Sequence, residues 1–226
     1  LYILFITKDN FKPLRKNTLF KSMEYIHEER NMLPKAFCRE LIEKFESDSK
    51  KQEGKVGLGH VDTTNKKRTD LMIGKYNDWM VKCDRIDKAF HTAFRNYQNN
   101  LKLNVFGVDK AYIVDQIFDN PNTIKSGFVM GRYGVGDHFN WHIDYTPNEN
   151  RLCNCIIYLN ENEACTEILN GKKIKPEPGK IVFFPSTWTY SHCGQKVEKG
   201  YKYVITCFIS PENVRNQNLP FLVSYN

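Results

Sequence analysis

Short β-rich runs fill the second half of the chain and limit what it can fold into. Runs of Val, Ile, Phe, Tyr and Cys are separated by Gly, Pro and Asn, residues that end strands and form turns. The clearest runs span residues 128–133, 153–159, 181–184 and 201–209. Many short strands with turns between them predict a β-sandwich or a barrel.

Two segments of helical periodicity precede these strands. In residues 33–45 and again in 79–94, apolar side chains recur every three or four positions, as on one face of a helix. We therefore expect a mainly β fold with bracing α-helices. Its core would be a double-stranded β-helix, a cupin-like jelly roll of about residues 105–210, and the helical support would lie within about residues 30–100.

Length and composition fit a single domain covering residues 1–226. A chain of 226 residues with 41% hydrophobic content can bury one full core, and it contains no internal repeat and no long linker. The apolar run Leu1–Ile6 is too short to span a bilayer, and no small-residue cleavage site follows it. We expect a strand there, no signal peptide or transmembrane segment, and a cytoplasmic protein, with a mature form trimmed of its leader as the alternative.

Cysteine usage and charge add two weaker expectations. The seven cysteines form no CxxC pair, which fits a reducing compartment better than a disulfide framework. The net charge of +7 includes the clusters Lys50-Lys51 and Lys66-Lys67-Arg68. Such clusters could contact phosphate or an acidic partner, but a solvated face is the simpler interpretation.

A candidate metal site begins at His142-Ile143-Asp144. Alternate residues of a strand point to the same face, so His142 and Asp144 can both point inward. A hydrogen-bonded pair on the surface is the competing interpretation. His192, which follows a strand-like run and a turn, is the candidate third ligand, unless it is a core or capping residue. Two imidazoles and one carboxylate suit the facial site of non-haem Fe(II) oxygenases.

Lys202 is the second unusual residue, because it lies in an otherwise apolar strand. It shares a strand face with Val204, Thr206 and Phe208, which would place it inside the barrel; a solvent-facing position is the alternative. An Fe(II) oxygenase that consumes 2-oxoglutarate needs a buried cation to pair with the distal carboxylate of that cosubstrate. Lys202 is the candidate for this role.

These residues lie in a longer resemblance that covers roughly residues 125–210. The order and spacing of its motifs are similar to the prolyl 4-hydroxylase branch of the Fe(II)/2-oxoglutarate dioxygenases. The motifs are Tyr133-Gly134 through Ile143-Asp144, Arg151 through Tyr158-Leu159-Asn160, His192-Cys193-Gly194, and Val197 through Tyr201-Lys202. Upstream, Leu33-Pro34 with Phe37-Cys38 and Leu41-Ile42 resembles the start of that family's domain.

The resemblance implies a set of cofactors and their ligands. It makes His142, Asp144 and His192 the ligands of Fe(II), and Lys202 the residue that binds the distal carboxylate of 2-oxoglutarate. Dioxygen is then the second cosubstrate, and ascorbate is a candidate reductant. The organic chemistry belongs to the iron and its cosubstrates, while the protein supplies ligands and orientation.

The same comparison assigns roles to four further residues. Tyr133 and Thr166 correspond to side chains that contact 2-oxoglutarate, and Tyr158 has a similar role in some branches. Arg151 corresponds to an arginine that faces the substrate. We also expect the pocket walls to be lined by the aromatic side chains of Trp141, Trp188, Tyr190 and Phe184.

The resemblance implies hydroxylation of peptidyl proline in a protein or peptide partner, with 2-oxoglutarate converted to succinate. Two departures affect the substrate side: residues 163–166 replace the family's Gly-Gly-Glu-Thr, and Phe139 replaces a tyrosine. The alternatives are the same chemistry on a free amino acid, a peptidyl lysine or a nucleobase, and a non-catalytic jelly-roll binding protein. No basic residue follows Lys202 before Arg215, which disfavours the nucleobase and nucleic acid as a partner.

Overall fold

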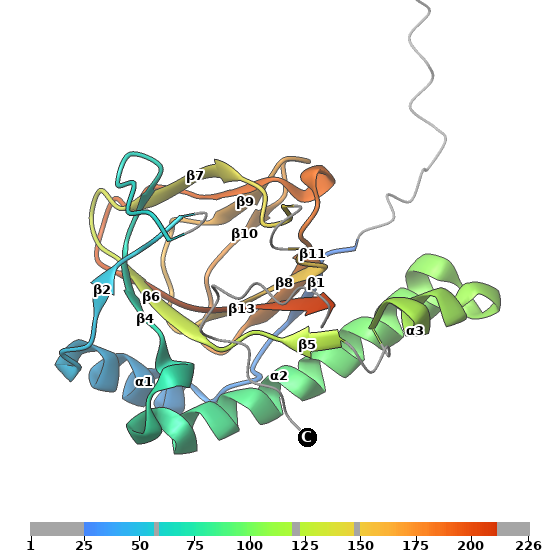
Figure 1. Cartoon of the computed structure of the whole chain (residues 1–226), viewed down its shortest axis with the longest axis horizontal. Helices are drawn as coiled ribbons and strands as arrows, with labels where there is room; N and C mark the ends of the chain where they lie inside the picture. Colours follow the sequence, from blue (N-terminus) through green and yellow to red (C-terminus); the bar gives the residue numbers. More distant parts are fainter. Residues whose placement is uncertain (1–24, 57–58, 119–122, 147–149, 212–226) are drawn as a thin grey trace, which may run out of the picture.

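The computed structural model describes residues 25–56, 59–118, 123–146 and 150–211, and in these residues the strands form two facing antiparallel sheets (Figure 1). The larger sheet has the order β1 (His27–Glu29), β11 (Ile181–Pro185), β8 (Cys153–Tyr158), β13 (Lys202–Pro211), β6 (Val129–Tyr133), β4 (Thr69–Leu71) and β2 (Gln52–Glu53), and β5 (Thr123–Lys125) also pairs with β13. The smaller sheet has the order β10 (Lys173–Ile174), β9 (Thr166–Ile168), β12 (His192–Gly194), β7 (His138–His142) and β3 (Lys66–Lys67). This is the jelly-roll architecture that the sequence predicts.

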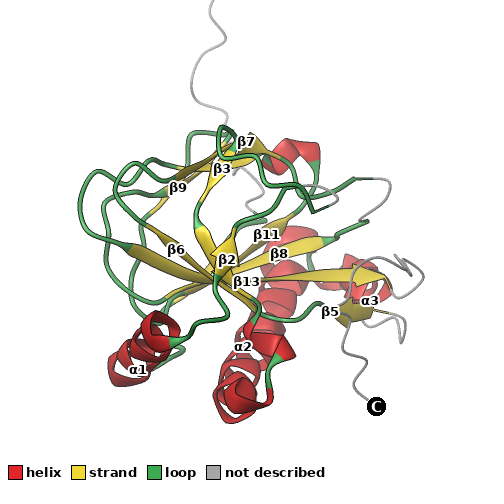
Figure 2. Cartoon of the chain, turned by 60° about the vertical axis from the view of Figure 1, so that its left-hand side comes forward, coloured by secondary structure: helices red, strands yellow, loops and turns green. Residues whose placement is uncertain are grey.

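Helices cover the outer face of the larger sheet, as Figures 1 and 2 show. They are α1 (Lys35–Ser47), α2 (Met80–Asn100) and α3 (Tyr112–Phe118), with a π-helical segment Leu101–Phe106 and short 3₁₀ turns at Ile73–Lys75, Asn77–Trp79 and Val108–Lys110. One further 3₁₀ turn, Trp188–Tyr190, lies between β11 and β12. The buried face of α2 carries Ile86, Phe90, Ala93 and Tyr97, spaced by three or four residues as expected for an amphipathic helix. The ring of Tyr97 stacks on Phe183 of β11 at a centroid distance of 5.4 Å, so aromatic packing joins this helix to the sheet.

The expected boundary between helical support and β core is wrong. Residues 101–118 are largely helical, and the next strand begins only at Thr123. The apolar residues of this segment pack with the helical layer: Val114 is fully buried, and Phe118 contacts Phe94 edge-on at 5.4 Å. The strand expected at Leu1–Ile6 lies outside the described residues.

A second, smaller core fills one end of the space between the two sheets. It consists of inward-facing side chains from both sheets, chiefly Tyr133, Tyr158, Ile168, Ile174, Val182, Phe184, Val197 and Val204. The other end of this space remains open as a cavity, which is described below. All seven cysteines are free. In the described part of the chain, no helix has both the length and the apolar character needed to cross a membrane.

Gly179 gives a stability prediction. Its φ is +79°, and a Cβ at this position would lie 2.1 Å from the backbone oxygen of Leu33. Its own carbonyl accepts a hydrogen bond from Met32 N at 2.9 Å, which fixes the approach to α1. Gly179→Ala should therefore cost more than the ~1–2 kcal/mol of a left-handed alanine. Gly171→Ala is the control, since Gly171 has φ +86° but no atom within 4 Å. Equal losses in urea unfolding would contradict the clash.

Candidate active site

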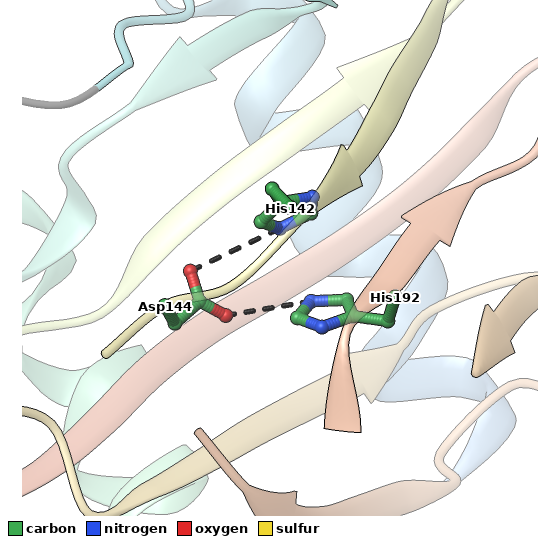
Figure 3. Close-up of side chains that lie close together, drawn as sticks. All are labelled: His142, Asp144 and His192. Carbon is green, nitrogen blue, oxygen red and sulfur yellow. Dashed lines mark ion pairs between the residues drawn. The ribbon is translucent and has the colours of Figure 1, made fainter. Parts of the chain in front are cut away.

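The smaller sheet brings together three of the residues that the sequence singles out. His142 is the last residue of β7 and His192 is the first of β12, and the two are direct cross-strand partners. Their ring centroids lie 4.2 Å apart. Asp144 follows two residues after β7, so it lies in the connecting loop and not on the strand itself. Figure 3 shows the three side chains pointing toward one another.

The distances within this cluster suit a metal ion. Asp144 Oδ1 lies 3.9 Å from Nε2 of His142, and Asp144 Oδ2 lies 3.4 Å from Nε2 of His192. One potential ligand atom from each residue lies within 4.8 Å of the others. Two imidazole nitrogens and one carboxylate oxygen occupy one side of such a space and leave the opposite side open.

Backbone carbonyls orient both histidine rings. Nδ1 of His142 lies 2.7 Å from the oxygen of Asn140, and Nδ1 of His192 lies 3.1 Å from the oxygen of Tyr190. Because a carbonyl only accepts hydrogen bonds, each Nδ1 must carry the proton. The Nε2 atoms then face Asp144, and in the neutral tautomer of each ring they are the atoms available as ligands. This is the usual arrangement of histidines that bind a metal.

The charge states of the cluster agree with this arrangement. Burial and the neighbouring His192 together lower the pKa of His142 to about 4. Burial alone would raise the pKa of Asp144, but His192, His142 and Arg151 outweigh it and hold that pKa below its usual range. At neutral pH His142 is therefore neutral and Asp144 is ionised, as metal coordination requires.

A cavity of about 920 Å³ opens between the two sheets beside this cluster. Lys202, Val204, Thr206 and Phe208 all line it, which confirms that this face of β13 points inward. Lys202 itself is 1% exposed, and its Nζ donates to the oxygen of Ala164 at 3.1 Å.

Lys202 has no acidic partner among the residues that the structure describes, and burial lowers its pKa to about 8. The side chain is still charged at neutral pH. A buried cation without an anion is costly, so this end of the cavity fits an anionic ligand.

Of the four other residues predicted for the site, three line the same cavity and Tyr158 lies behind its wall. Tyr133 and Thr166 line it near Lys202, whose Nζ lies 4.7 Å from the centre of the Tyr133 ring. Tyr158 does not line the cavity, and instead its hydroxyl donates to Oγ1 of Thr166 at 2.7 Å from behind. Arg151 lines the cavity beside Asp144, with 3.5 Å between Nη1 and Oδ1.

None of the four expected aromatic wall residues lines the cavity, and Phe184 and Tyr190 pack with the smaller core instead. Trp141 and Trp188 are 49% and 73% exposed. Trp141 directly precedes His142 on β7, so alternation places it on the opposite face of the sheet. Phe184 is closer to expectation, since its ring contacts that of His192 edge-on at 4.9 Å. Phe139 stacks on His142 at 3.6 Å and lines the cavity.

Sequence reasoning missed three charged residues in the cavity wall. Lys66, Arg68 and Asp70 are each less than 10% exposed and all line the cavity. The expectation of a solvated face at residues 66–68 is correct only for Lys67, whose side chain is 55% exposed. The available signal was the alternation of Lys66, Arg68 and Asp70, which puts all three on one face of an extended segment.

Comparison with known proteins identifies the domain. The sequence model of the 2OG-Fe(II) oxygenase superfamily matches residues 128–210, which include both histidines, Asp144 and Lys202. This matched segment is that of a 2-oxoglutarate-dependent dioxygenase, and the protein is called the oxygenase below. Among curated protein sequences, none matches it significantly.

Solved structures with a similar fold include prolyl hydroxylases. The viral collagen prolyl hydroxylase of Paramecium Bursaria Chlorella virus-1, in its 2OG complex, is 21% identical with a TM-score of 0.55, over 82% of the oxygenase and 95% of the viral chain. A prolyl hydroxylase from Trichoplax adhaerens, in complex with a hypoxia inducible factor peptide fragment, is 16% identical with a TM-score of 0.62, over 85% and 86%. A Pseudomonas putida prolyl-4-hydroxylase is 15% identical with a TM-score of 0.53, over 82% and 92%. At these identities the likeness establishes the double-stranded β-helix fold.

Proposed function

We propose that the oxygenase hydroxylates peptidyl proline and that His142, Asp144 and His192 bind its Fe(II). The donor set supports this assignment: it supplies two ring nitrogens and one carboxylate, all within 4.8 Å and beside an open cavity. When bound, iron, 2-oxoglutarate and O2 together supply one oxygen atom to a C–H bond and the other to succinate, with release of CO2. Ascorbate is the proposed reductant that keeps the iron ferrous.

Lys202 is proposed to bind the distal carboxylate of 2-oxoglutarate, with Tyr133 and Thr166 beside it. The support is the buried charge of Lys202, which has no acidic partner in the described part of the chain. Tyr158 would act indirectly, because its hydroxyl positions that of Thr166. These contacts would orient the cosubstrate before reaction, which is a large part of what the protein contributes to catalysis.

The aromatic rings beside the two histidines orient the imidazoles and exclude water in this proposal. Phe139 covers one face of His142, and the edge of Phe184 meets His192. Together with the bonds from Nδ1 to the backbone, these contacts fix the ring planes. Apolar walls also exclude water from the reacting atoms, which limits side reactions.

The size and opening of the cavity carry the proposal of a peptide substrate. At about 920 Å³ it lies at the upper end of the range for small-molecule sites, and residues from 52–56, 59–66 and 143–146, with Arg151, form much of its wall. That space leaves room for an extended chain next to the cosubstrate, and Arg151 lies at the proposed substrate side. The Trichoplax adhaerens neighbour of similar fold is described as a complex with a peptide fragment.

The test uses purified oxygenase and a His142→Ala control, each with Fe(II), 2-oxoglutarate and a panel of peptides, with and without ascorbate. The panel contains proline-rich, collagen-like and lysine-containing peptides. We expect succinate and a gain of one oxygen on a proline peptide, both absent from the control. Succinate with oxygen only on lysine, or only with free amino acids or nucleic acid, would reject the proline substrate. Absence of succinate under every condition would support a non-catalytic binding protein.

A further inference from the structure

Lys66, Arg68 and Asp70 form a buried charged cluster that the proposed chemistry does not use. Lys66 Nζ lies 3.3 Å from Asp70 Oδ2 and donates to the oxygen of Lys55 at 2.8 Å. Arg68 Nε lies 2.5 Å from Asp70 Oδ1 as an ion pair, although the two atoms are not aligned for a hydrogen bond. Two cations thus share one carboxylate.

Two glycines in the neighbouring backbone leave room for this cluster. A Cβ at Gly131 would lie 2.8 Å from Cζ of Arg68 and 3.0 Å from Oδ1 of Asp70. A Cβ at Gly54 would lie 3.0 Å from Cγ of Arg68. The hydroxyl of Tyr133, 3.2 Å from Arg68 Nη1, completes the support. Backbone and side chains therefore hold the guanidinium in one place at the cavity wall.

Lys66 connects the cluster to the proposed metal ligands. Its Nζ lies 5.2 Å from the centre of the Phe139 ring, and this ring stacks on His142. Burial and the neighbouring Arg68 lower the pKa of Lys66 to about 8, so the side chain is still charged at pH 7. A positive charge thus lies one aromatic ring away from the reacting centre.

The buried charges around the cavity leave this cluster with one positive charge in excess. With the proposed cofactors bound, Fe(II) is balanced by Asp144 and by the first carboxylate of 2-oxoglutarate, and Lys202 is balanced by the second. Asp70 then balances only one of Lys66 and Arg68. Arg151, whose side chain is 18% exposed, shares Asp144 with the proposed iron site at 3.5 Å. The remaining charged residues of the wall, Glu53, Lys55 and Lys75, are exposed to solvent, which screens them. A buried charge without compensation costs several kcal/mol.

We infer that the peptide substrate carries an acidic side chain, which binds to Lys66 and Arg68. This inference rests on the proposed peptide substrate and adds its specificity. Consecutive Cα atoms are about 3.8 Å apart, so a carboxylate that reaches this cluster belongs to a residue within about two positions of the hydroxylated one. An arginine and a lysine side by side are well suited to a carboxylate, because hydrogen bonds between ionised partners are the strong ones.

The test uses matched peptides and a neighbouring lysine as control. Each peptide has one proline and one Glu, and the Glu lies one or two positions before or after the proline. A second peptide with Gln in place of that Glu is its partner. The variants are Lys66→Met, which keeps the length of the side chain, and Lys67→Met, which removes an exposed charge next to it. The measurements are kcat/KM for each peptide, and binding of peptide and of 2-oxoglutarate to the Mn(II)-loaded protein.

At one Glu position or more, we expect the unmodified protein to prefer the acidic peptide at least about tenfold over its Gln partner. Lys66→Met should bring this ratio close to one, whereas Lys67→Met should keep it, and neither should change the affinity for 2-oxoglutarate. Equal use of Glu and Gln peptides, or a preference that survives Lys66→Met, would overturn the inference. Weaker binding of 2-oxoglutarate to Lys66→Met, without a change in peptide preference, would assign the cluster to the cosubstrate and also overturn it.

The binding measurement separates this inference from the proposed function. Acidic peptides that bind in preference to their Gln partners but gain no oxygen would support the acidic site and reject prolyl hydroxylation. Hydroxylation of proline at equal rates in the Glu and Gln peptides would support prolyl hydroxylation and reject the acidic site. Failure of every peptide to bind would reject the acidic peptide as the ligand of this cluster.

Discussion

His192→Ala should lose its metal ion and its activity together. His192 is proposed to give one of three protein ligands, and its ring is fixed by the Tyr190 carbonyl and by the edge of Phe184. Loss of a residue that only supports a ligand typically reduces metal affinity about 10- to 100-fold, so loss of the ligand itself should cost more than about 100-fold. Alanine also leaves Asp144 without one of the two imidazoles that keep it ionised.

The direct measurement is titration with Mn(II) or Fe(II), followed by succinate formation under saturating 2-oxoglutarate. His91→Ala is the matched control, because His91 lies on the exposed side of α2, with 57% of its side chain exposed. It should bind metal like the unmodified protein. Retention of normal metal affinity by His192→Ala would show that His192 is not a ligand.

Lys202→Met should raise the KM for 2-oxoglutarate by a large factor. Lys202 is buried at that end of the cavity, where its Nζ lies between the oxygen of Ala164 and the ring of Tyr133. Removing one partner of a buried ion pair costs about 2–5 kcal/mol, roughly a 30-fold to several-thousandfold loss of affinity. Methionine keeps the length and apolar stem of lysine, so packing between Tyr133 and Ala164 is largely preserved.

Comparison of two cosubstrates makes this prediction specific. 2-Oxobutyrate has the 2-oxo acid group of 2-oxoglutarate but no distal carboxylate. The unmodified protein should strongly prefer 2-oxoglutarate, and Lys202→Met should lose most of that preference, which general misfolding would not produce. Lys173→Met, at a lysine with 58% of its side chain exposed, should leave the preference intact. An unchanged preference in Lys202→Met would place the distal carboxylate elsewhere.

The β-rich half of the fold was predictable because its longest strands are apolar on both faces. Four predicted runs correspond to β6, β8, β11 and β13, which lie between the helices and the interior of the barrel. The strands of the smaller sheet were harder to predict. β7 reads His-Phe-Asn-Trp-His, and a register irregularity against β12 brings both Phe139 and His142 to the cavity, so its alternation does not show which face is inside. β9, β10 and β12 have only two or three residues each, too few to show a period.

The candidate site was predictable as far as its residues carry a motif. His142, Asp144, His192 and Lys202 come together at one cavity, as the resemblance implies, while their roles as ligands remain predictions. The cluster at residues 66–70 was not found, because a run of basic residues looks the same in sequence whether it is solvated or buried. Pairing of β3 with β7 and of β4 with β6, which only tertiary structure supplies, turns this segment inward.

The pairing of β1 with β11 has a practical consequence for any shortened form of the chain. Residues His27–Glu29 cover one side of Ile181–Phe183, part of the apolar β11, and Lys180 anchors them through Glu28 at 3.2 Å. A form that began after Arg30 would expose the backbone donors and acceptors of an apolar edge strand. Such edges associate with one another, so the truncated protein should aggregate even though every proposed active-site residue is retained.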